Sequence, residues 1–309
     1  MKSRLTIFFA VLSLCCACAP RYETIQGYAQ GGVYSVKYNS QGVRASRAEI
    51  AKGVDGILIA IDTTLSGYNR NSLLSRRNAG EEVELNDMFR DIEAISEHYR
   101  EITGGAFDVA AGPLFDIWGF GFTSDSLPSG ERIAEAMERC HRREVLNFNA
   151  IAQGYSCDQV ANYLRSLGVK DMLVDIGEIY CDGVNPHSVG WTIGIDTPED
   201  GNETPGAKLS GTWHSDGKGH GVVTSGNYRK FYIRDGRKYA HTIDPRTGRP
   251  VEHDLLSATV IAPTATEADA LATFFMVIGF EEAKAWVEAH DDIEACLIRA
   301  GGIWQSEGF

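Results

Sequence analysis

The chain has 309 residues, of which 43% are hydrophobic and 23% are charged, a composition typical of a globular protein that buries a core. The net charge of −13 and the isoelectric point near 5.1 argue against a nucleic-acid-binding or polybasic membrane surface, so we expect no nucleic-acid partner. A polyanionic ligand would have to be held by local cations, by helix termini or by a metal ion.

The N-terminal segment is typical of an export signal. Lys2 and Arg4 precede an apolar run, residues 5–14, that is too short to span a bilayer and has the length of a signal-peptide core. We therefore expect a leader over residues 1–18 and a mature chain over residues 19–309.

Three cysteines crowd the end of this apolar run. A small residue before a cysteine at this place resembles a bacterial lipoprotein cleavage site, so Cys18, which follows Ala17, is the expected lipidated residue and Cys16 is the alternative. A lipid anchor would attach the exported protein to a membrane, facing the periplasm, without a transmembrane helix. The other interpretation is an ordinary secretory signal with chance cysteines.

Strand and helix patterns alternate in the first half of the mature chain. Alternating apolar residues predict strands over residues 22–40, with a break at Gly31 and Gly32. Apolar residues at helical spacing predict three helices, over residues 47–66, 86–105 and 156–169. Asn86 is the expected cap of the second helix.

The second half of the chain is richer in strands. Strands are expected within residues 171–183, 190–198, 219–251, 255–265 and 293–302, with the first two as neighbours. A hairpin is expected to turn at Asp235 and Gly236, and helices are expected over residues 262–275 and 281–289. Because the strands come in hairpin-like groups, we predict an α+β fold with a mixed, largely antiparallel sheet and packed helices.

The domain organisation is predicted to be simple. The sequence contains no glycine-rich loop in the Rossmann or phosphate-loop pattern between a strand and a helix. It also contains no internal repeat and no charge-rich linker. We therefore treat the mature chain as a single compact catalytic unit.

Four cysteines follow the leader: Cys140, Cys157, Cys181 and Cys296. Their spacing matches no paired metal-ligand motif, although an exported protein could oxidise them to two disulfides. Cys157 lies on an expected helix, where buried free thiols are common. We predict no catalytic cysteine.

The expected helix over residues 262–275 carries two oxygen ligands on one face. Asp269 and Thr273 lie four residues apart, so their side chains are neighbours. Such hard oxygen ligands suit Mg²⁺, which leaves room for substrate phosphate oxygens. Thr266 and Asp269 also fit a capping box, in which Asp269 reaches back to its own helix start. The spacing alone leaves both interpretations open.

Five separated blocks occur in order, at residues 64–78, 104–121, 147–177, 222–251 and 257–279. Together they resemble the ApbE-type flavin transferase family, the FAD:protein FMN transferases, over nearly the whole mature chain. The resemblance implies a T-fold-like architecture, FAD as substrate and Mg²⁺ as cofactor.

The resemblance also implies a site built from distant segments. The implied metal ligands are Asp269, Thr273 and the main-chain carbonyl of Ala152. The implied FAD contacts are Tyr68, Ala106, Phe107, Asp108, Asn149, Tyr155, Thr224, Ser225, His241 and Ile243. Tyr68 is suited to stack on a flat ring. For Ser225 a role as a turn cap is equally open.

Two positions depart from the family pattern. Gln153 stands where the family often has a lysine, which would remove a cation near the pyrophosphate. The block around Gly177 usually has two glycines, and here Glu178 follows directly. Either change could alter cofactor binding.

The expected activity is Mg²⁺-dependent transfer of the FMN half of FAD to a threonine hydroxyl of an acceptor flavoprotein, with release of AMP. His241 or Asp244 is the candidate base for the threonine. The resemblance implies an acceptor in a membrane electron-transport complex. The alternatives are an FAD pyrophosphatase that uses the same site and a non-catalytic FAD-binding lipoprotein.

Overall fold

The computed structural model describes residues 21–120, 127–202, 204–228, 231–234 and 237–309. The expected leader, with Cys16 and Cys18, lies outside the described residues, as do Asp235 and Gly236 of the expected hairpin turn. Within the described part of the chain, no helix is both long and apolar enough to cross a membrane.

An eight-stranded sheet organises the fold, and all of its neighbouring strands are antiparallel. In spatial order the strands are β1 (Tyr22–Ala29), β2 (Gly32–Asn39), β3 (Met172–Asp175), β4 (Ile179–Asp182), β7 (His220–Gly226), β12 (Leu255–Ala262), β13 (Glu294–Arg299) and β14 (Gly302–Gln305). The predicted α+β class is confirmed.

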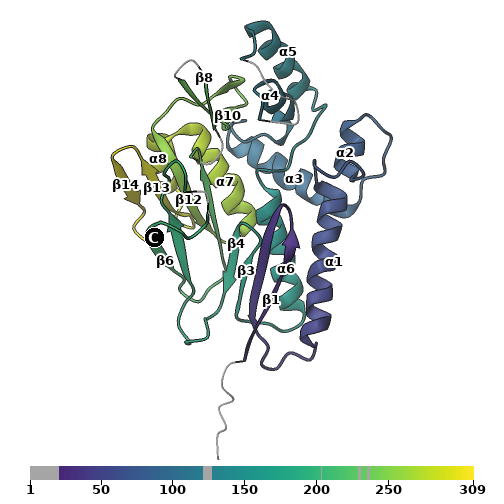
Figure 1. Ribbon diagram of the computed structural model, residues 1–309, viewed down its shortest axis with the longest axis vertical. Coiled ribbons are helices and arrows are strands. Elements are labelled where there is room, and N and C mark those ends of the chain that lie inside the picture. The colour runs from purple at the N-terminus through teal and green to yellow at the C-terminus, as the bar shows by residue number, and fades with distance from the viewer. Residues whose placement is uncertain (1–20, 121–126, 203, 229–230, 235–236) are drawn as a thin grey trace, which may run out of the picture.

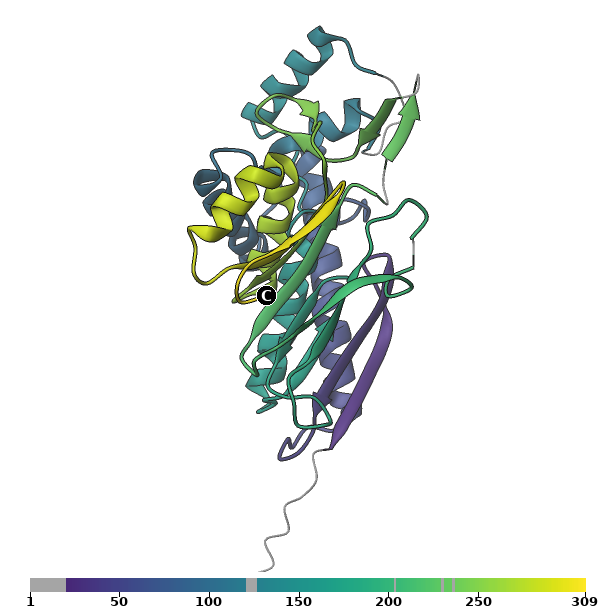
Figure 2. The same ribbon diagram turned by 90° about the vertical axis from the view of Figure 1, so that its left-hand side faces the viewer.

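Helices contribute one layer of the core. They are α1 (Arg47–Leu65), α2 (Leu73–Asn78), α3 (Asp87–Ile102), the 3-10 turn η1 (Val109–Ala111), α4 (Gly112–Ile117), α5 (Gly130–His141), α6 (Ala152–Ser166), α7 (Ala265–Ile278) and α8 (Phe280–Glu288). The helices α1, α6 and α7 run alongside the strands of the sheet (Figures 1 and 2). Apolar residues of α1 and α6 pack on β1, β2 and β3, and those of α7 pack on β7 and β12.

Three small hairpins complete the fold: β5 (Thr192–Asp196) with β6 (Leu209–His214), β8 (Phe231–Arg234) with β9 (Arg237–Ala240), and β10 (Ile243–Asp244) with β11 (Arg249–Pro250). The β5–β6 hairpin buries Trp191 and Trp213 with Val222 and Ile261 of the main sheet. The other two hairpins gather with α4 and α5 at one end of the molecule, the upper end in both views (Figures 1 and 2).

The predicted helix boundaries hold where the caps are explicit. Ser46 caps α1 through a capping box with Glu49, and the Asn86 side chain accepts a hydrogen bond from the Phe89 amide at 2.9 Å. The helix α6 begins at Ala152, four residues before its predicted start. This extension places Ala152, Gln153 and Gly154 in the first turn of a helix, with Ile151 as its N-cap.

The expected pairing of residues 171–183 with residues 190–198 is wrong. The first segment is itself a hairpin, because Gly177 adopts φ +94° between β3 and β4. The second segment forms β5, which pairs with β6 and belongs to a separate small sheet. Periodicity reports strands but does not report their partners.

The four cysteines of the described chain are free and buried. Burial raises the pKa of Cys140 to about 11 and of Cys181 to about 12, and it raises that of Cys157 well above its usual range. These thiols are therefore protonated and shielded. This agrees with the prediction that none is catalytic.

Candidate active site

One contact between α6 and α7 places a carboxylate of α7 at the N-terminus of α6. The Gly154 amide donates a hydrogen bond to Oδ2 of Asp269 at 2.9 Å. A Cβ atom on Gly154 would lie 2.2 Å from the Ala265 carbonyl oxygen and 2.8 Å from the Asp269 Cβ atom. Glycine is therefore required for the two helices to approach this closely.

The start of α7 is held by residues other than Asp269. Its N-cap is Thr264, whose side chain accepts a hydrogen bond from the Glu267 amide at 3.1 Å. The Asp158 carboxylate of α6 accepts hydrogen bonds from the Ala265 amide at 2.9 Å and the Thr266 amide at 2.8 Å. The capping box between Thr266 and Asp269, left open by the sequence, does not form.

Asp269 is a buried carboxyl group whose charge is uncompensated. Its pKa is raised to about 7, mainly because burial disfavours the charged form; Asp158 also raises it, and the Gly154 amide lowers it. No positively charged side chain of the described residues is among the groups that shift this pKa. A divalent cation would stabilise the carboxylate here, so the donor chemistry fits the implied metal.

The two other implied metal ligands lie next to this contact in the chain. Thr273 is one helical turn after Asp269 and is partly exposed, whereas the residues around it on α7 are buried. Ala152 is the first residue of α6, and its carbonyl oxygen accepts a hydrogen bond from the Ser156 hydroxyl at 2.6 Å. The described residues contain no cluster of three His, Cys, Asp or Glu side chains that could form an alternative metal site.

A cavity of about 1030 Å³ opens beside the start of α6. Six residues of the predicted blocks line it: Leu65, Ser66, Tyr68, Asn149, Ala152 and Gln153. The Asn149 side-chain amide donates a hydrogen bond to the Tyr68 hydroxyl at 3.3 Å. The opposite wall comes from α1 and from the turn between β1 and β2.

Three large side chains that line this cavity are exposed. Tyr28, Ile59 and Tyr68 line the cavity and are 74%, 63% and 70% exposed. Exposed aromatic rings at a cavity mouth can stack on a planar ring of a ligand. The volume and the lining suit a large heterocyclic ligand such as a dinucleotide.

Gln153 contacts the β3–β4 turn, in which Glu178, the other departure from the family pattern, follows Gly177. The Gln153 amide donates a hydrogen bond to the Ile176 carbonyl oxygen at 3.2 Å, and a Cβ atom on Gly177 would lie 2.5 Å from Gln153 Nε2. The β3–β4 turn therefore packs directly on the first turn of α6. Gln153 pins this turn in place instead of presenting a positive charge.

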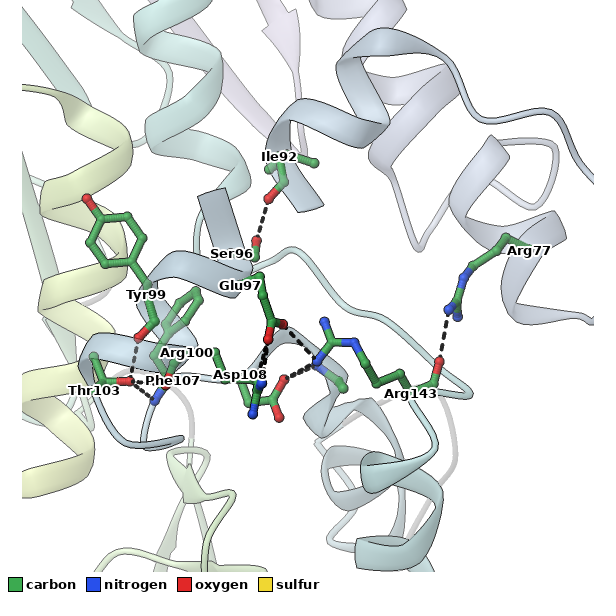
Figure 3. Close-up of polar contacts among 11 residues, drawn as sticks. Arg77, Ile92, Ser96, Glu97, Tyr99, Arg100, Thr103, Phe107, Asp108 and Arg143 are labelled. Carbon is green, nitrogen blue, oxygen red and sulfur yellow. Dashed lines mark hydrogen bonds and ion pairs between the residues drawn. The ribbon is translucent and has the colours of Figure 1, made fainter. Parts of the chain in front are cut away.

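The "GGAFD" segment, residues 104–108, is held in place by burial and by polar contacts. Ala106 and Phe107 are buried in the core, and Asp108 caps η1 by accepting a hydrogen bond from the Ala110 amide at 2.8 Å. Figure 3 shows Arg143 reaching Asp108 at 3.4 Å and Glu97 at 3.5 Å. Asp108 is thus held by a cap and an ion pair.

The segment from His241 to Val251 forms a loop tied to its surroundings. Both carboxylate oxygens of Asp244 are paired with the Arg246 guanidinium, at 3.0 and 2.9 Å. The Trp118 indole donates a hydrogen bond to the Gly248 carbonyl oxygen at 2.8 Å. The His241 ring lies edge-on to Phe120, with centroids 6.4 Å apart.

This loop lies next to α7 and next to Gly105. Its strand β10 packs against α7, and the Arg246 Cγ atom lies 4.0 Å from the position of a Cβ atom on Gly105. Ile243 is buried with Leu114 and Trp118. The loop therefore joins the "GGAFD" segment to the helix that carries Asp269.

The remaining implied contacts are distributed over the scaffold. Thr224 and Ser225 lie at the end of β7, where Thr224 shares a hydrogen bond with Thr259 at 2.8 Å. The Tyr155 hydroxyl donates to Asp91 at 2.8 Å, and its ring lines a different cavity, between α3 and α6. Tyr155 thus supports the start of α6 from the side away from Tyr68.

The geometry above agrees with comparisons against known proteins. The model of the ApbE family matches residues 31–297. The chain belongs to the ApbE family. An FAD:protein FMN transferase of Escherichia coli K12 is 34% identical over 270 residues, which cover 79% of this chain and 75% of that protein. Membership in this family makes the chain a transferase.

Solved structures of the ApbE family have the same fold. The apo flavinyl transferase ApbE of Pseudomonas stutzeri is 33% identical with a TM-score of 0.82, covering 94% of this chain and 96% of that chain. The flavin transferase ApbE of Vibrio cholerae is 29% identical with a TM-score of 0.79, covering 94% and 98%.

Sequence reasoning missed three residues that shape the site. Gly154 is identified only once the approach of α7 is known, although a glycine in a first helical turn is a signal for close packing. Ser156 lies four residues after Ala152, a spacing that predicts contact on a helix. Gln30 reaches the same place from the β1–β2 turn, and no sequence pattern indicates this.

Proposed function

We propose that the protein transfers the FMN half of FAD to a threonine hydroxyl of an acceptor flavoprotein and releases AMP, in a reaction that requires Mg²⁺. The single observation that carries the proposal is the position of the Asp269 carboxylate. This buried group of α7 accepts a hydrogen bond from the first turn of α6, next to the residues of α6 that line a cavity of dinucleotide size. Names of its relatives specify the same flavin transfer.

Asp269, Thr273 and the Ala152 carbonyl would hold the metal. When bound, Mg²⁺ neutralises charge on the diphosphate, which is the main contribution to lowering the barrier of phosphoryl transfer. The protein groups contribute positioning: the Gly154 amide, in the first turn of α6, fixes the Asp269 carboxylate.

The transfer forms one bond and breaks one. The threonine oxygen attacks the phosphorus of the FMN half, and the bond from this phosphorus to the bridging oxygen breaks, so that AMP leaves. His241 takes the hydroxyl proton in this proposal. Asp244 is paired with Arg246 through both oxygens, so we assign it the task of holding the loop that carries His241.

The location of the protein follows from the sequence signal. We propose that the protein is exported, anchored by a lipid at Cys18, with Cys16 as the alternative, and that it faces the periplasm. The acceptor would then be a flavoprotein of a membrane electron-transport complex.

The deciding experiment compares wild type with Asp269→Asn. Both are incubated with FAD, Mg²⁺ and a threonine-containing acceptor, and flavin fluorescence in the acceptor band is measured on a denaturing gel. Wild type should label the acceptor, and Asp269→Asn should lose at least about 100-fold in rate, the scale of one transition-state contact. Labelling that survives the substitution or the removal of Mg²⁺ contradicts the proposal.

A parallel reaction without acceptor separates transfer from hydrolysis. Free FMN released at the transfer rate would support an FAD pyrophosphatase on the same site. FAD that binds but is never split, with or without acceptor, would support a non-catalytic flavin-binding protein.

A further inference from the structure

The turn between β1 and β2 carries a strained polar residue. Gln30 and Gly31 form a two-residue turn, with Ala29 paired to Gly32, and their φ angles are +52° and +82°. Left-handed backbone is uncommon for a residue such as glutamine. Strain of this kind is often associated with a function of the side chain.

The Gln30 side chain points from this turn to the first turns of α6. Its Nε2 atom donates a hydrogen bond to the Ser156 hydroxyl at 2.5 Å. Its Oε1 atom is buried and has no hydrogen-bond partner among the described residues. Gln30 also lines the cavity with Tyr68 and Ala152. A buried amide oxygen without a partner is costly unless another state of the protein satisfies it.

The Ser156 hydroxyl links Gln30 to Ala152 through two hydrogen bonds. Its hydroxyl is fully buried and donates to the Ala152 carbonyl oxygen at 2.6 Å. In an α-helix the same carbonyl also faces the amide of residue 156. A carbonyl oxygen has two lone pairs, so Ala152 is saturated in this arrangement. A cation could bind this oxygen only if the Ser156 hydroxyl left it.

We propose that Gln30 and Ser156 are positioning residues that control access to the Ala152 carbonyl, an inference that rests on the proposed metal role of this carbonyl. In the arrangement described above, Ser156 blocks the carbonyl. On cation binding, the hydroxyl rotates away and donates to Oε1 of Gln30 instead.

The exchange needs little motion. The terminal amide of glutamine rotates about a soft torsion, which brings Oε1 to the position of Nε2. The Ser156 hydroxyl then changes from acceptor and donor to donor alone. The buried Oε1 atom gains the partner that it lacks, and Nε2 is free to donate into the cavity. Two hydrogen bonds are lost and one is gained, and the contact between the Ala152 carbonyl oxygen and the cation replaces the other.

The first test measures Mn²⁺ binding directly, from the free-ion signal in electron paramagnetic resonance, with and without saturating FAD. Ser156→Ala removes the competing hydroxyl, so Mn²⁺ should bind about two- to tenfold more tightly than in wild type, the range expected for one net hydrogen bond. Unchanged or weaker binding by Ser156→Ala overturns the proposal.

The second test removes the alternative acceptor. Gln30→Met keeps an unbranched side chain of similar length without the amide, so Mn²⁺ should bind about two- to tenfold more weakly. In a Ser156→Ala background the same substitution should have no effect, because no hydroxyl then needs an acceptor. An equal effect of Gln30→Met in both backgrounds also overturns the proposal.

Matched variants control for general effects. Ser166 on α6 donates its hydroxyl to the Tyr163 carbonyl oxygen at 2.7 Å on the exposed surface, and Gln26 is an exposed glutamine on β1. Ser166→Ala and Gln26→Met should bind Mn²⁺ as wild type does. If the Asp269→Asn variant binds Mn²⁺ as tightly as wild type does, the proposed metal site itself is wrong. If only the Ser156 and Gln30 variants disagree, the metal site stands and the exchange is wrong.

Discussion

At the scale of single residues, the site depends on the absence of a Cβ atom at Gly154 as much as on the Asp269 carboxylate. Gly154 lets its amide meet Asp269, and the space that a Cβ atom would need is filled by α7. The sequence could predict Asp269 and Thr273 as neighbours, because helical spacing determines this. It could not predict what faces them, because that depends on how two helices distant in the chain pack.

Gly154→Ala should therefore damage both stability and activity. The added methyl group forces α6 and α7 apart, which should lower the free energy of unfolding by about 1–3 kcal/mol, and FMN transfer should fall with the loss of the Asp269 contact. Chemical denaturation and the gel assay measure the two effects.

The control for this prediction is a helical glycine with free space around it. Gly56 on α1 is exposed, and a Cβ atom there would meet no atom within 4 Å. Gly56→Ala should raise the free energy of unfolding by about 0.5–1 kcal/mol, because alanine favours a helix. If both alanine variants behaved alike, the contact between α6 and α7 would not be the cause.

At the scale of elements, short segments are fastened to one another by few hydrogen bonds. Trp118 is the C-cap of α4; its indole donates a hydrogen bond to the Gly248 carbonyl oxygen, and its ring stacks on Tyr239 at 6.1 Å between centroids. This contact joins α4 to the loop that carries His241. Removing the indole N–H should loosen the loop without unfolding the sheet.

Trp118→Phe should accelerate hydrogen exchange in residues 244–251 and slow FMN transfer by about two- to tenfold, because one buried hydrogen bond contributes about 0.5–1.5 kcal/mol. Trp191 is the matched control, since its indole donates to the Asp182 carbonyl oxygen at 2.9 Å and its ring lies in a different hydrophobic cluster from Trp118. Trp191→Phe should leave the loop and the transfer rate unchanged. Equal slowing by both variants would contradict a specific role for α4.

The predicted elements were correct where local signals are strong. The helices α1 and α3 begin at Ser46 and Asn86 caps that are readable in the sequence. The short helices α2 and α4 have six residues each, too few for a periodic pattern, and were not predicted. The start of α6 was placed late, because Ile151 offers no side-chain cap.

At the scale of the whole molecule, the core holds four cysteines that remain thiols. Cys140 and Cys157 lie in separate hydrophobic clusters, Cys181 and Cys296 share a third, and none of the four forms a disulfide. Their raised pKa values and their burial both oppose reaction. The sequence was compatible both with two disulfides and with free thiols. Only the three-dimensional arrangement distinguishes these two states.

Protein without residues 1–20 should expose no thiol to a disulfide reagent at pH 8 in the folded state and four thiols after unfolding in guanidinium chloride. Absorbance of the released thiolate counts the reacting cysteines. The thermal midpoint should also be the same with and without a reductant. Rapid reaction of a folded-state thiol, or a midpoint lowered by reductant, would contradict this arrangement.

The fold class was predictable because hairpin-like strand groups require an antiparallel sheet, whereas the strand order was not. The order places β7 between β4 and β12, which brings residues from the middle and the end of the chain together. Such long-range pairing leaves no trace in local periodicity. The sequence blocks that resemble the family indicate which residues form the site. The order of the strands in the sheet determines how those residues are arranged.

The direction of the first strand has a consequence for a protein held at a surface. β1 is eight residues long, so Arg21 and Gln30, which flank it, lie about 30 Å apart at opposite ends of the strand. A lipid tether that enters at Arg21 would thus hold the molecule by the end remote from its cavity. The opening would look out into the surrounding compartment, where a large acceptor can approach it without touching the bilayer.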